Sequence, residues 1–313
     1  MSEGGLFTEV FVAALLFGVV TAGIPLLLAG LGEQISEKAG VLNIGIEGMM
    51  LMGAYGGFVV AFYTGSFWLG FLVGGVAGAV VASLMVLFCV VLTMNQIVIG
   101  IALTIGAEGL TALLHHFQFS RTYPRLAEVP TLDIPLLRDI PVVGSAFFEH
   151  HPVVYLSVAL VLAITWLFRR TYMGLNLQAA GDRPAALDAA GVDVRATRAY
   201  AVLATGFLAG VGGAYMANVG AGLFVPFMTH GAGFIGIVLA MLARGRPLWV
   251  LLGAALFGGS LALTTALQVV GLNIPTDVVQ MLPFAMVMVV LVLFARHSHL
   301  PAALGIPYHR GQR

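Results

Sequence analysis

The sequence RRTYMGLNLQAAGDRPAALDAAGVDVRATRAY, residues 169–200, is a polar segment between two strongly apolar runs, residues 153–168 and 201–215. It carries five of the fourteen basic residues of the chain: Arg169, Arg170, Arg183, Arg195 and Arg198. Short loops rich in arginine stay on the cytoplasmic side of a membrane. We therefore expect residues 171–199 to form a cytoplasmic loop between two membrane spans.

A short helix is predicted within this loop, over residues 183–190. Asp182 can cap its free amides, Pro184 suits the first turn, and Gly191 can supply the left-handed residue that ends it. The exposed face of this helix would be mostly alanine, which lets another protein surface come close. The alternative is an amphipathic helix lying on the membrane, but such a helix needs large apolar residues that this one lacks.

The composition is that of a polytopic membrane protein. The chain has 313 residues, of which 60% are hydrophobic and 9% charged, whereas soluble domains contain about 25% charged residues. The net charge is zero and the basic residues are spread along the chain, so we expect no nucleic-acid partner. Cys89 is the single cysteine, which excludes a disulfide within the chain.

The predicted fold is all-α: a single transmembrane domain, residues 1–313, built as a helical bundle of about eight to ten spans. Some spans are expected to be broken or re-entrant, above all the short, glycine-containing run 231–242. The apolar runs are residues 8–31, 41–63, 67–93, 96–116, 153–168, 201–219, 231–242, 248–270 and 278–295. Counted from the arginine-rich loop, these spans place the C-terminus in the cytoplasm.

The long polar stretch 117–151 then falls on the extracytoplasmic face. Its prolines and mixed charges are typical of an ordered loop rather than a separate domain. In an importer this loop would meet a substrate-binding protein. It could equally be a lid that covers helix ends, and the sequence does not separate these two interpretations.

Polar residues interrupt the second apolar run, SEKAGVLNIGIEGMMLMGAY, which begins at Ser36. An acid at membrane depth is costly and marks a functional site by default. Irregular backbone is tolerated there when it lines a cavity or is buried in protein. Asn43 and Glu47 are therefore candidates for a substrate pathway. The alternative, which we weight almost equally, is that Glu47 caps a broken helix by accepting amide hydrogen bonds.

Further candidates for the substrate pathway lie in later spans and in the glycine-rich turn near residue 222. They are Glu108, Asn218, Phe224, Phe227 and His230. Aromatic rings and amide or carboxylate groups could bind a nucleoside, and similar groups could bind a sugar. No histidine, cysteine or carboxylate spacing typical of a metal site is present, and no nucleophile–base pair suggests catalysis, so we expect neither a metal nor an enzymatic activity.

Small residues recur every four positions in two runs. They are Gly70, Gly74, Gly78 and Ala82 in one and Gly206, Gly210 and Ala214 in the other. Such stripes allow helices to pack closely in a membrane.

The segment MGLNLQAAGDRPAALDAAGVDVRATRAYAVLATGFLAGVGGAY, with the segment from Ser36 and the run GLNIPTDVVQMLPFAMVMVVLVL, resembles permease subunits of ATP-binding-cassette importers of the branched-chain amino acid/ribose superfamily. Within it, the likeness is to the nucleoside and simple-sugar branch. It covers roughly residues 26–294 and departs from the family pattern at Gln178, Asp182, Arg183 and Gly245.

The resemblance implies that the short helix docks into an ATPase subunit and couples ATP hydrolysis to transport. The residues implied are Gly181, Asp182, Arg183, Pro184, Ala185, Ala186, Ala189 and Gly191. It also implies that a second, related permease completes the translocation path as a heterodimer, that a substrate-binding lipoprotein delivers the substrate, and that the chain lies in the cell membrane of a prokaryote. The counted spans place the N-terminus outside, whereas the family normally starts inside, so the resemblance also implies one extra short crossing or re-entrant element within residues 8–63.

No cofactor of its own is expected for this chain. Lys38 is the single lysine, so a phosphate-binding loop ending in Gly-Lys-Ser/Thr cannot be written, and ATP must be hydrolysed by another subunit. The resulting prediction is an importer permease for nucleosides or simple sugars. The alternative is a stand-alone, proton-coupled secondary transporter of a small polar solute, which would leave the capped, alanine-rich helix without a purpose.

Overall fold

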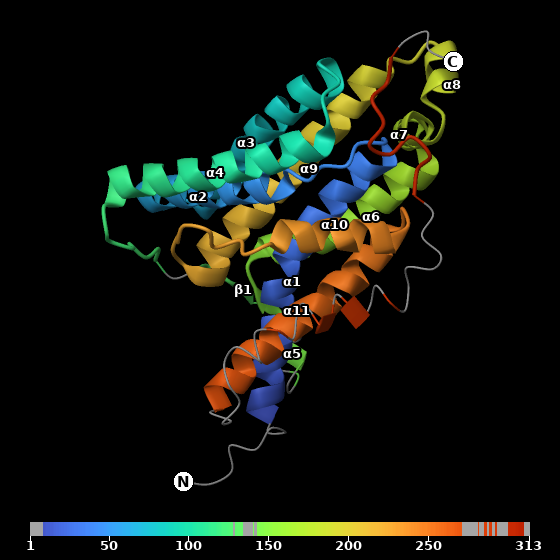
Figure 1. Ribbon diagram of the computed structural model, residues 1–313. Coiled ribbons are helices and arrows are strands. Elements are labelled where there is room, and N and C mark those ends of the chain that lie inside the picture. Colours follow the sequence, from blue (N-terminus) through green and yellow to red (C-terminus); the bar gives the residue numbers. More distant parts are fainter. Residues whose placement is uncertain are drawn as a thin grey trace, which may run out of the picture.

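The computed structural model describes residues 9–127, 129–133, 140, 143–270, 281, 285–286, 288–289, 292 and 300–309. It confirms an all-α membrane bundle (Figure 1). The long helices are α1 (Glu9–Lys38), α2 (Ile46–Thr64), α3 (Phe67–Met85), α4 (Gln96–Phe119), α6 (Pro152–Arg170), α9 (Val194–Tyr215) and α11 (Pro247–Val270). The shorter ones are α5 (Val143–Phe147), α7 (Tyr172–Asp182), α8 (Pro184–Ala189) and α10 (Ala232–Ala243), and π-helical turns η1 (Val86–Val91) and η2 (Met216–Ala221) extend α3 and α9.

Seven of the described helices are long and apolar enough to cross a membrane, and α10 is a shorter apolar helix of 12 residues. A hydrocarbon core about 30 Å thick needs about 20 helical residues, so α10 crosses only part of it, as predicted for residues 231–242. The extra short crossing expected within residues 8–63 is wrong for residues 9–63, because α1 runs unbroken through Pro25 and only the short irregular segment 39–45 separates it from α2. The predicted span 278–295 lies largely outside the described residues.

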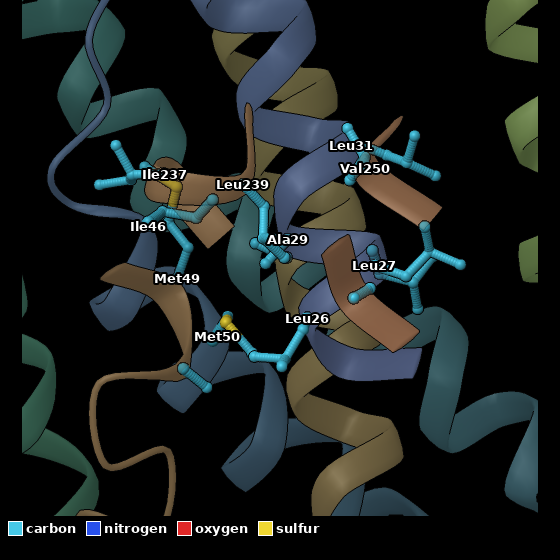
Figure 2. Packing of buried hydrophobic residues seen from close by; sticks show 14 of the residues in the cluster. Leu26, Leu27, Ala29, Leu31, Ile46, Met49, Met50, Ile237, Leu239 and Val250 are labelled. Atoms are coloured by element: carbon cyan, nitrogen blue, oxygen red, sulfur yellow. The ribbon is translucent and has the colours of Figure 1, made fainter. Parts of the chain in front are cut away.

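The second half of α1 is the centre of the bundle. Every residue from Gly23 to Gln34 is buried, because α9, α10 and α11 pack around this helix. Figure 2 shows side chains of α1, including Leu26, Leu27 and Leu31, among side chains of α2, α10 and α11. A helix that is apolar on all sides is typical of a protein core or a membrane span, and this half of α1 is buried in the protein itself.

The predicted stripes of small residues face one another where α2, α3 and α9 meet. A Cβ atom added at Gly78 would lie 2.8 Å from the Cα of Gly210, and one added at Gly57 would lie 2.6 Å from the Cβ of Ala214. Side chains larger than hydrogen cannot fit at these positions. Lipid tails are as apolar as leucine, so close backbone packing of this kind is a main source of helix association in a membrane.

The two ends of the bundle differ. The loop formed by α7 and α8 follows α6 and packs beside the C-terminal end of α1, together with residues 300–309. The segment between α4 and α6 lies at the other end, where His150 stacks on Phe17 of α1 with ring centroids 4.4 Å apart. That segment contains α5 and a two-stranded antiparallel sheet, β1 (Leu132–Asp133) and β2 (Glu149–His150).

Residues 39–45 form an irregular, non-helical segment between α1 and α2. Gly40 has a φ of +86°, which favours glycine, and the chain turns back beside the last turns of α1. Gln96, at the start of α4, accepts a hydrogen bond from the backbone N–H of Leu42 through Oε1 (2.8 Å). This side chain replaces a backbone partner that the irregular segment lacks.

The packing of small residues can be tested with one methyl group. At Gly210 a Cβ atom would lie 3.1 Å from the Cα of Gly78 and closer still to the carbonyl oxygen of Gly74. We expect Gly210→Ala to lower the free energy of unfolding by about 1–3 kcal/mol, the usual cost of overpacking. Thermal unfolding of the purified chain in detergent measures the change.

Gly109→Ala is the matched control, since α4 leaves open space around a Cβ atom at Gly109. Alanine has the higher helix propensity, so this variant should be as stable as the wild type or slightly more stable. Equal losses of stability in the two variants would contradict the packing described.

Candidate functional site

The short helix α8 is built by backbone breaks on both sides of it. Arg183 has φ −145° and ψ 71°, which ends α7 after Asp182, and Pro184 then occupies the first turn of α8. Gly191 has a φ of +83° and supplies the left-handed residue predicted for the end of the helix. The predicted cap is wrong: Asp182 belongs to the last turn of α7, where its carboxylate accepts a hydrogen bond from Gln178 (3.4 Å), and α8 has no side-chain cap.

A single buried side chain fastens α8 to the bundle. Leu187 is 5% exposed and packs with Ala180 of α7 and Val194 of α9. The N-terminus of α9 is fixed in turn by Asp193, whose Oδ1 accepts hydrogen bonds from the amides of Arg195 (2.8 Å) and Ala196 (3.1 Å). This cap starts α9 at Val194, seven residues before the predicted span, and shortens the polar loop accordingly.

The predicted coupling residues form an exposed surface, with one exception. Ala185, Ala186 and Ala189 are exposed, as are Asp182, Arg183 and Gly191, and Pro184 is half-buried. Gly181 is buried instead: a Cβ atom there would lie 3.0 Å from Cβ of Pro301 and 3.1 Å from the backbone nitrogen of Gly40. The result is a small-residue surface, hereafter the alanine face (Ala185, Ala186 and Ala189), on a firmly anchored helix.

Glu47 lies in the first turn of α2 and bridges to α10. Its Oε1 accepts a hydrogen bond from the amide of Gly231 (2.8 Å), and its Oε2 accepts one from the amide of Gly233 (2.7 Å). The side chain is 3% exposed. A Cβ atom at Gly233 would lie 2.7 Å from the Cα of Glu47, so glycine is required for this approach.

This geometry matches the capping alternative, with the difference that Glu47 caps α10 rather than its own helix. The amides at a helix N-terminus lack intrahelical partners and carry partial positive charge, so they stabilise a carboxylate. Both oxygens of Glu47 are therefore occupied, which disfavours Glu47 as a mobile proton carrier.

Asn43 lies in the irregular segment just before α2 and is fully buried. Its backbone N–H donates to Oε1 of Glu33 on α1 (3.0 Å), and its Nδ2 contacts Sδ of Met49 (3.4 Å). Glu33 is also fully buried. The pair fixes residues 39–45 against α1, and with Glu47 it forms a polar belt that joins α1, α2 and α10 inside the apolar bundle.

Two other predicted pathway residues are buried toward the opposite end of the bundle. Asn218 in η2 donates through Nδ2 to the carbonyl of Gly57 (3.4 Å). Phe224 is fully buried among aromatic rings, with centroids 5.2 Å from Tyr55 and 5.7 Å from His115. Both side chains therefore hold α2, α4 and the turn after η2 together.

Phe227, His230 and Glu108 are the predicted pathway residues that retain exposure. Phe227 and His230 are exposed in the turn before α10, and His230 lines a largely apolar cavity of about 740 Å³ between α1, η2 and α11. Glu108 is half-buried on α4. The structure thus places the seven predicted pathway residues in several separate surroundings rather than around one cavity.

Sequence reasoning missed Arg198 and Glu33. Arg198 was counted with the loop arginines, yet it is 3% exposed and belongs to α9. Its position, five residues after the Asp193 cap and on the face of Val194 and Ala201, could have indicated burial. Glu33 could have been found by the same rule that selected Glu47, since it lies at the end of an apolar run.

The capping role of Glu47 is testable by removing its charge. In Glu47→Gln the side-chain NH₂ group would face one of the two amides that now donate to the carboxylate. We expect the loss of one charge-assisted hydrogen bond to lower the free energy of unfolding by about 1.5–3 kcal/mol. Thermal unfolding in detergent and the amount of folded protein in membranes measure the effect.

Glu108→Gln is the control, because Glu108 is half-buried in the middle of α4. Its stability should equal that of the wild type. A Glu47→Gln variant that is fully stable but inactive in transport would contradict the capping role and return Glu47 to the pathway.

Comparison with known proteins places the chain in a family. Residues 15–291 match the family described as "Branched-chain amino acid transport system / permease component". The putative glucose ABC transporter permease protein TsgC13 of Haloferax volcanii is 41% identical over 252 residues, which cover 79% of this chain and 76% of that protein.

Two further relatives are similar over nearly their whole length. The nucleoside ABC transporter permease protein NupC of Lactococcus lactis is 33% identical, covering 91% of this chain and 93% of its own. The guanosine ABC transporter permease protein NupQ of Bacillus subtilis is 32% identical, covering 92% and 94%. A second, more distant permease from each of the same three organisms also matches, at 24–28% identity. The chain is a multi-pass membrane protein and belongs to the permease-component family of branched-chain amino acid transport systems.

Proposed function

We propose that this chain is the permease subunit of an ATP-binding-cassette importer and that its substrates are nucleosides or simple sugars. The observation that carries this proposal is the alanine face of α8, exposed on a helix that Leu187 anchors to the bundle. A surface of small side chains admits a partner at close range. The family membership and the permeases named for glucose, nucleosides and guanosine support the same function and substrate class.

The end of the bundle with α7 and α8 is proposed to face the cytoplasm. Arg169, Arg170, Arg183 and Arg195 lie there, and all four are exposed. Cytoplasmic loops carry an excess of arginine and lysine. Residues 300–309 pack at this same end, where the amide of Ala303 donates to the carbonyl of Gly181 (2.8 Å). This packing supports a cytoplasmic C-terminus. The segment 117–151, at the other end, would then meet a substrate-binding lipoprotein.

The ATPase subunit is proposed to dock on the alanine face, around residues 181–191. ATP would be bound and hydrolysed entirely by that partner. Closure of the ATPases would displace α8, and the membrane helices would alternate between outward-open and inward-open arrangements. The contribution of this chain is mechanical: it receives the displacement at one end and changes access to the substrate along its length.

A second, related permease is proposed to complete the transporter. The three organisms named above each contribute two matching permeases, one 32–41% identical to this chain and one 24–28% identical. Such pairs support a heterodimer in which this chain takes the place of the more similar member. The partner in its own cell would then be of the more distant kind.

Glu108 is the strongest remaining candidate for the wall of the substrate pathway. It lies on α4, the least buried of the seven spans, next to Gly109, where a Cβ atom would meet open space. A carboxylate at membrane depth faces protein or water rather than lipid, so this side of α4 is proposed to border an aqueous path. His230 and Phe227 would contribute at the outer mouth, while Asn43, Glu47, Asn218 and Phe224 would shape the path by fixing the helices behind it.

Enlarging the alanine face tests the docking role. Ala186→Trp adds volume where a cleft would have to fit α8, and Gly191→Val strains a residue whose φ is +83°. Overpacking costs about 1–3 kcal/mol, or roughly 5- to 150-fold in affinity. We expect both variants to lose co-purifying ATPase and substrate-stimulated ATP hydrolysis.

Ala127→Trp is the control, because Ala127 is exposed at the other end of the bundle. It should retain the co-purifying ATPase, which is the property compared with this control. If Ala186→Trp and Gly191→Val retain the ATPase as Ala127→Trp does, and also keep full stimulated hydrolysis, α8 is not the docking helix.

A further inference from the structure

Arg198 sits at a junction of four chain segments near the cytoplasmic end proposed above. It lies in the second turn of α9 and is 3% exposed. Its Nε donates to the carbonyl of Ala39 (3.1 Å), its Nη2 to the carbonyl of Ala180 (3.2 Å), and its Nη1 to the carbonyl of Ile306 (2.8 Å). One guanidinium therefore holds the end of α1, the end of α7 and the segment 300–309 against α9.

The positive charge of Arg198 lies against carbonyl groups at the C-terminal ends of α1 and α7. Ala39 follows the last residue of α1, and Ala180 lies in the last turn of α7. The carbonyls at a helix C-terminus lack intrahelical partners and carry partial negative charge. A cation that donates to both helix ends is stabilised, and it also fixes the two ends at a set distance from each other.

Glycines make this junction close enough for one side chain to span it. A Cβ atom at Gly40 would lie 2.9 Å from Nη2 of Arg198 and 3.1 Å from the Cα of Gly181. The carbonyls of Gly40 and Gly181 also accept hydrogen bonds from the amides of Gly305 (3.1 Å) and Ala303 (2.8 Å). The backbones of α1, α7 and the segment 300–309 are thus in direct contact around the guanidinium.

The junction connects the docking helix to the polar belt. Leu187 packs α8 on Ala180, the residue whose carbonyl Arg198 holds. On the other side of the guanidinium, α1 carries Glu33, which holds Asn43 just before α2, and Glu47 of α2 holds the start of α10. These contacts form a continuous series from α8 to α10, through which a displacement of α8 can be transmitted.

We infer that Arg198 is a positioning residue for energy coupling: it makes the α7–α8 loop and the end of α1 move as one body, so that a displacement of α8 by an ATPase reaches the substrate pathway. This inference rests on the proposed function. It assigns to Arg198 no contact with the substrate or with the ATPase, because the guanidinium is buried behind α8.

The test uses Arg198→Lys and Arg198→Met in the complete transporter, reconstituted in vesicles. Lysine keeps the charge but cannot donate to three separate segments in the planar arrangement of a guanidinium, and methionine keeps an extended side chain without charge. The measured quantity is the number of substrate molecules imported per ATP hydrolysed. A role in stability alone would lower import and hydrolysis in proportion and leave this ratio unchanged.

We expect Arg198→Met to keep the ATPase bound and hydrolysing, with the ratio reduced about tenfold, and Arg198→Lys to fall between it and the wild type. Arg195→Met, an exposed arginine three residues earlier, should leave the ratio unchanged. A wild-type ratio in Arg198→Lys overturns the inference, even if Arg198→Met fails to accumulate. A wild-type transporter without ATP-dependent uptake would instead refute the proposed function, and the inference with it.

Discussion

The carboxylate of Glu47 against the first amides of α10 is the contact on which the arrangement of this bundle depends. The helix α10 has 12 residues, and Ala232 and Gly233 in its first turn are buried, so the free N–H groups there need partners within the protein. An unsatisfied backbone group in hydrocarbon costs several kcal/mol. By supplying two oxygens at 2.7–2.8 Å, Glu47 makes a partial span possible and fixes α2 to α10.

Arg198 has the corresponding role at helix C-termini, where a positive charge binds carbonyl groups that lack intrahelical partners. It binds carbonyls at the ends of α1 and α7, whereas Glu47 binds amides at the start of α10. In both cases a charge on one helix satisfies the unpaired backbone groups of another. Glycines at Gly40, Gly181 and Gly233 allow the approach. These two contacts lie at different depths, and the buried half of α1 connects them.

The sequence was sufficient to predict most of the helices and the exposure of the alanine face of α8. Apolar runs of sufficient length indicated the spans, the small residues of α3 and α9 indicated their contact, and Pro184 and Gly191 indicated α8. What it could not predict was which backbone group each buried charge would bind. Glu47 and Gly231 are separated by 184 positions, and Arg198 binds residues that precede and follow it by more than 100 positions. Contacts of this kind depend on how the spans pack, and no local pattern records them.

The predictions for Asp182 and Arg198 were wrong because they were made from residue type and local sequence alone. Asp182 is of a residue type that often caps helices. Arg183, however, has a non-helical backbone conformation that ends α7 directly after Asp182, so Asp182 is the last residue of α7. Arg198 was predicted to lie in the loop. The Asp193 cap starts α9 at Val194, so Arg198 belongs to this helix and its side chain is buried. The predicted pathway residues were selected by residue type rather than by position, and several of them pack or bind between helices. Glu108 keeps the exposure that a pathway residue needs.

Cross-linking from α8 tests the central claim most directly. A cysteine at Ala186 in a Cys89→Ala background carries a short cross-linker in the assembled complex, and a cysteine at Ala127 serves as the reference at the other end of the bundle. The account predicts that the probe at Ala186 links to the ATPase subunit and that the probe at Ala127 does not. A link to the ATPase from Ala127, with none from Ala186, would contradict it.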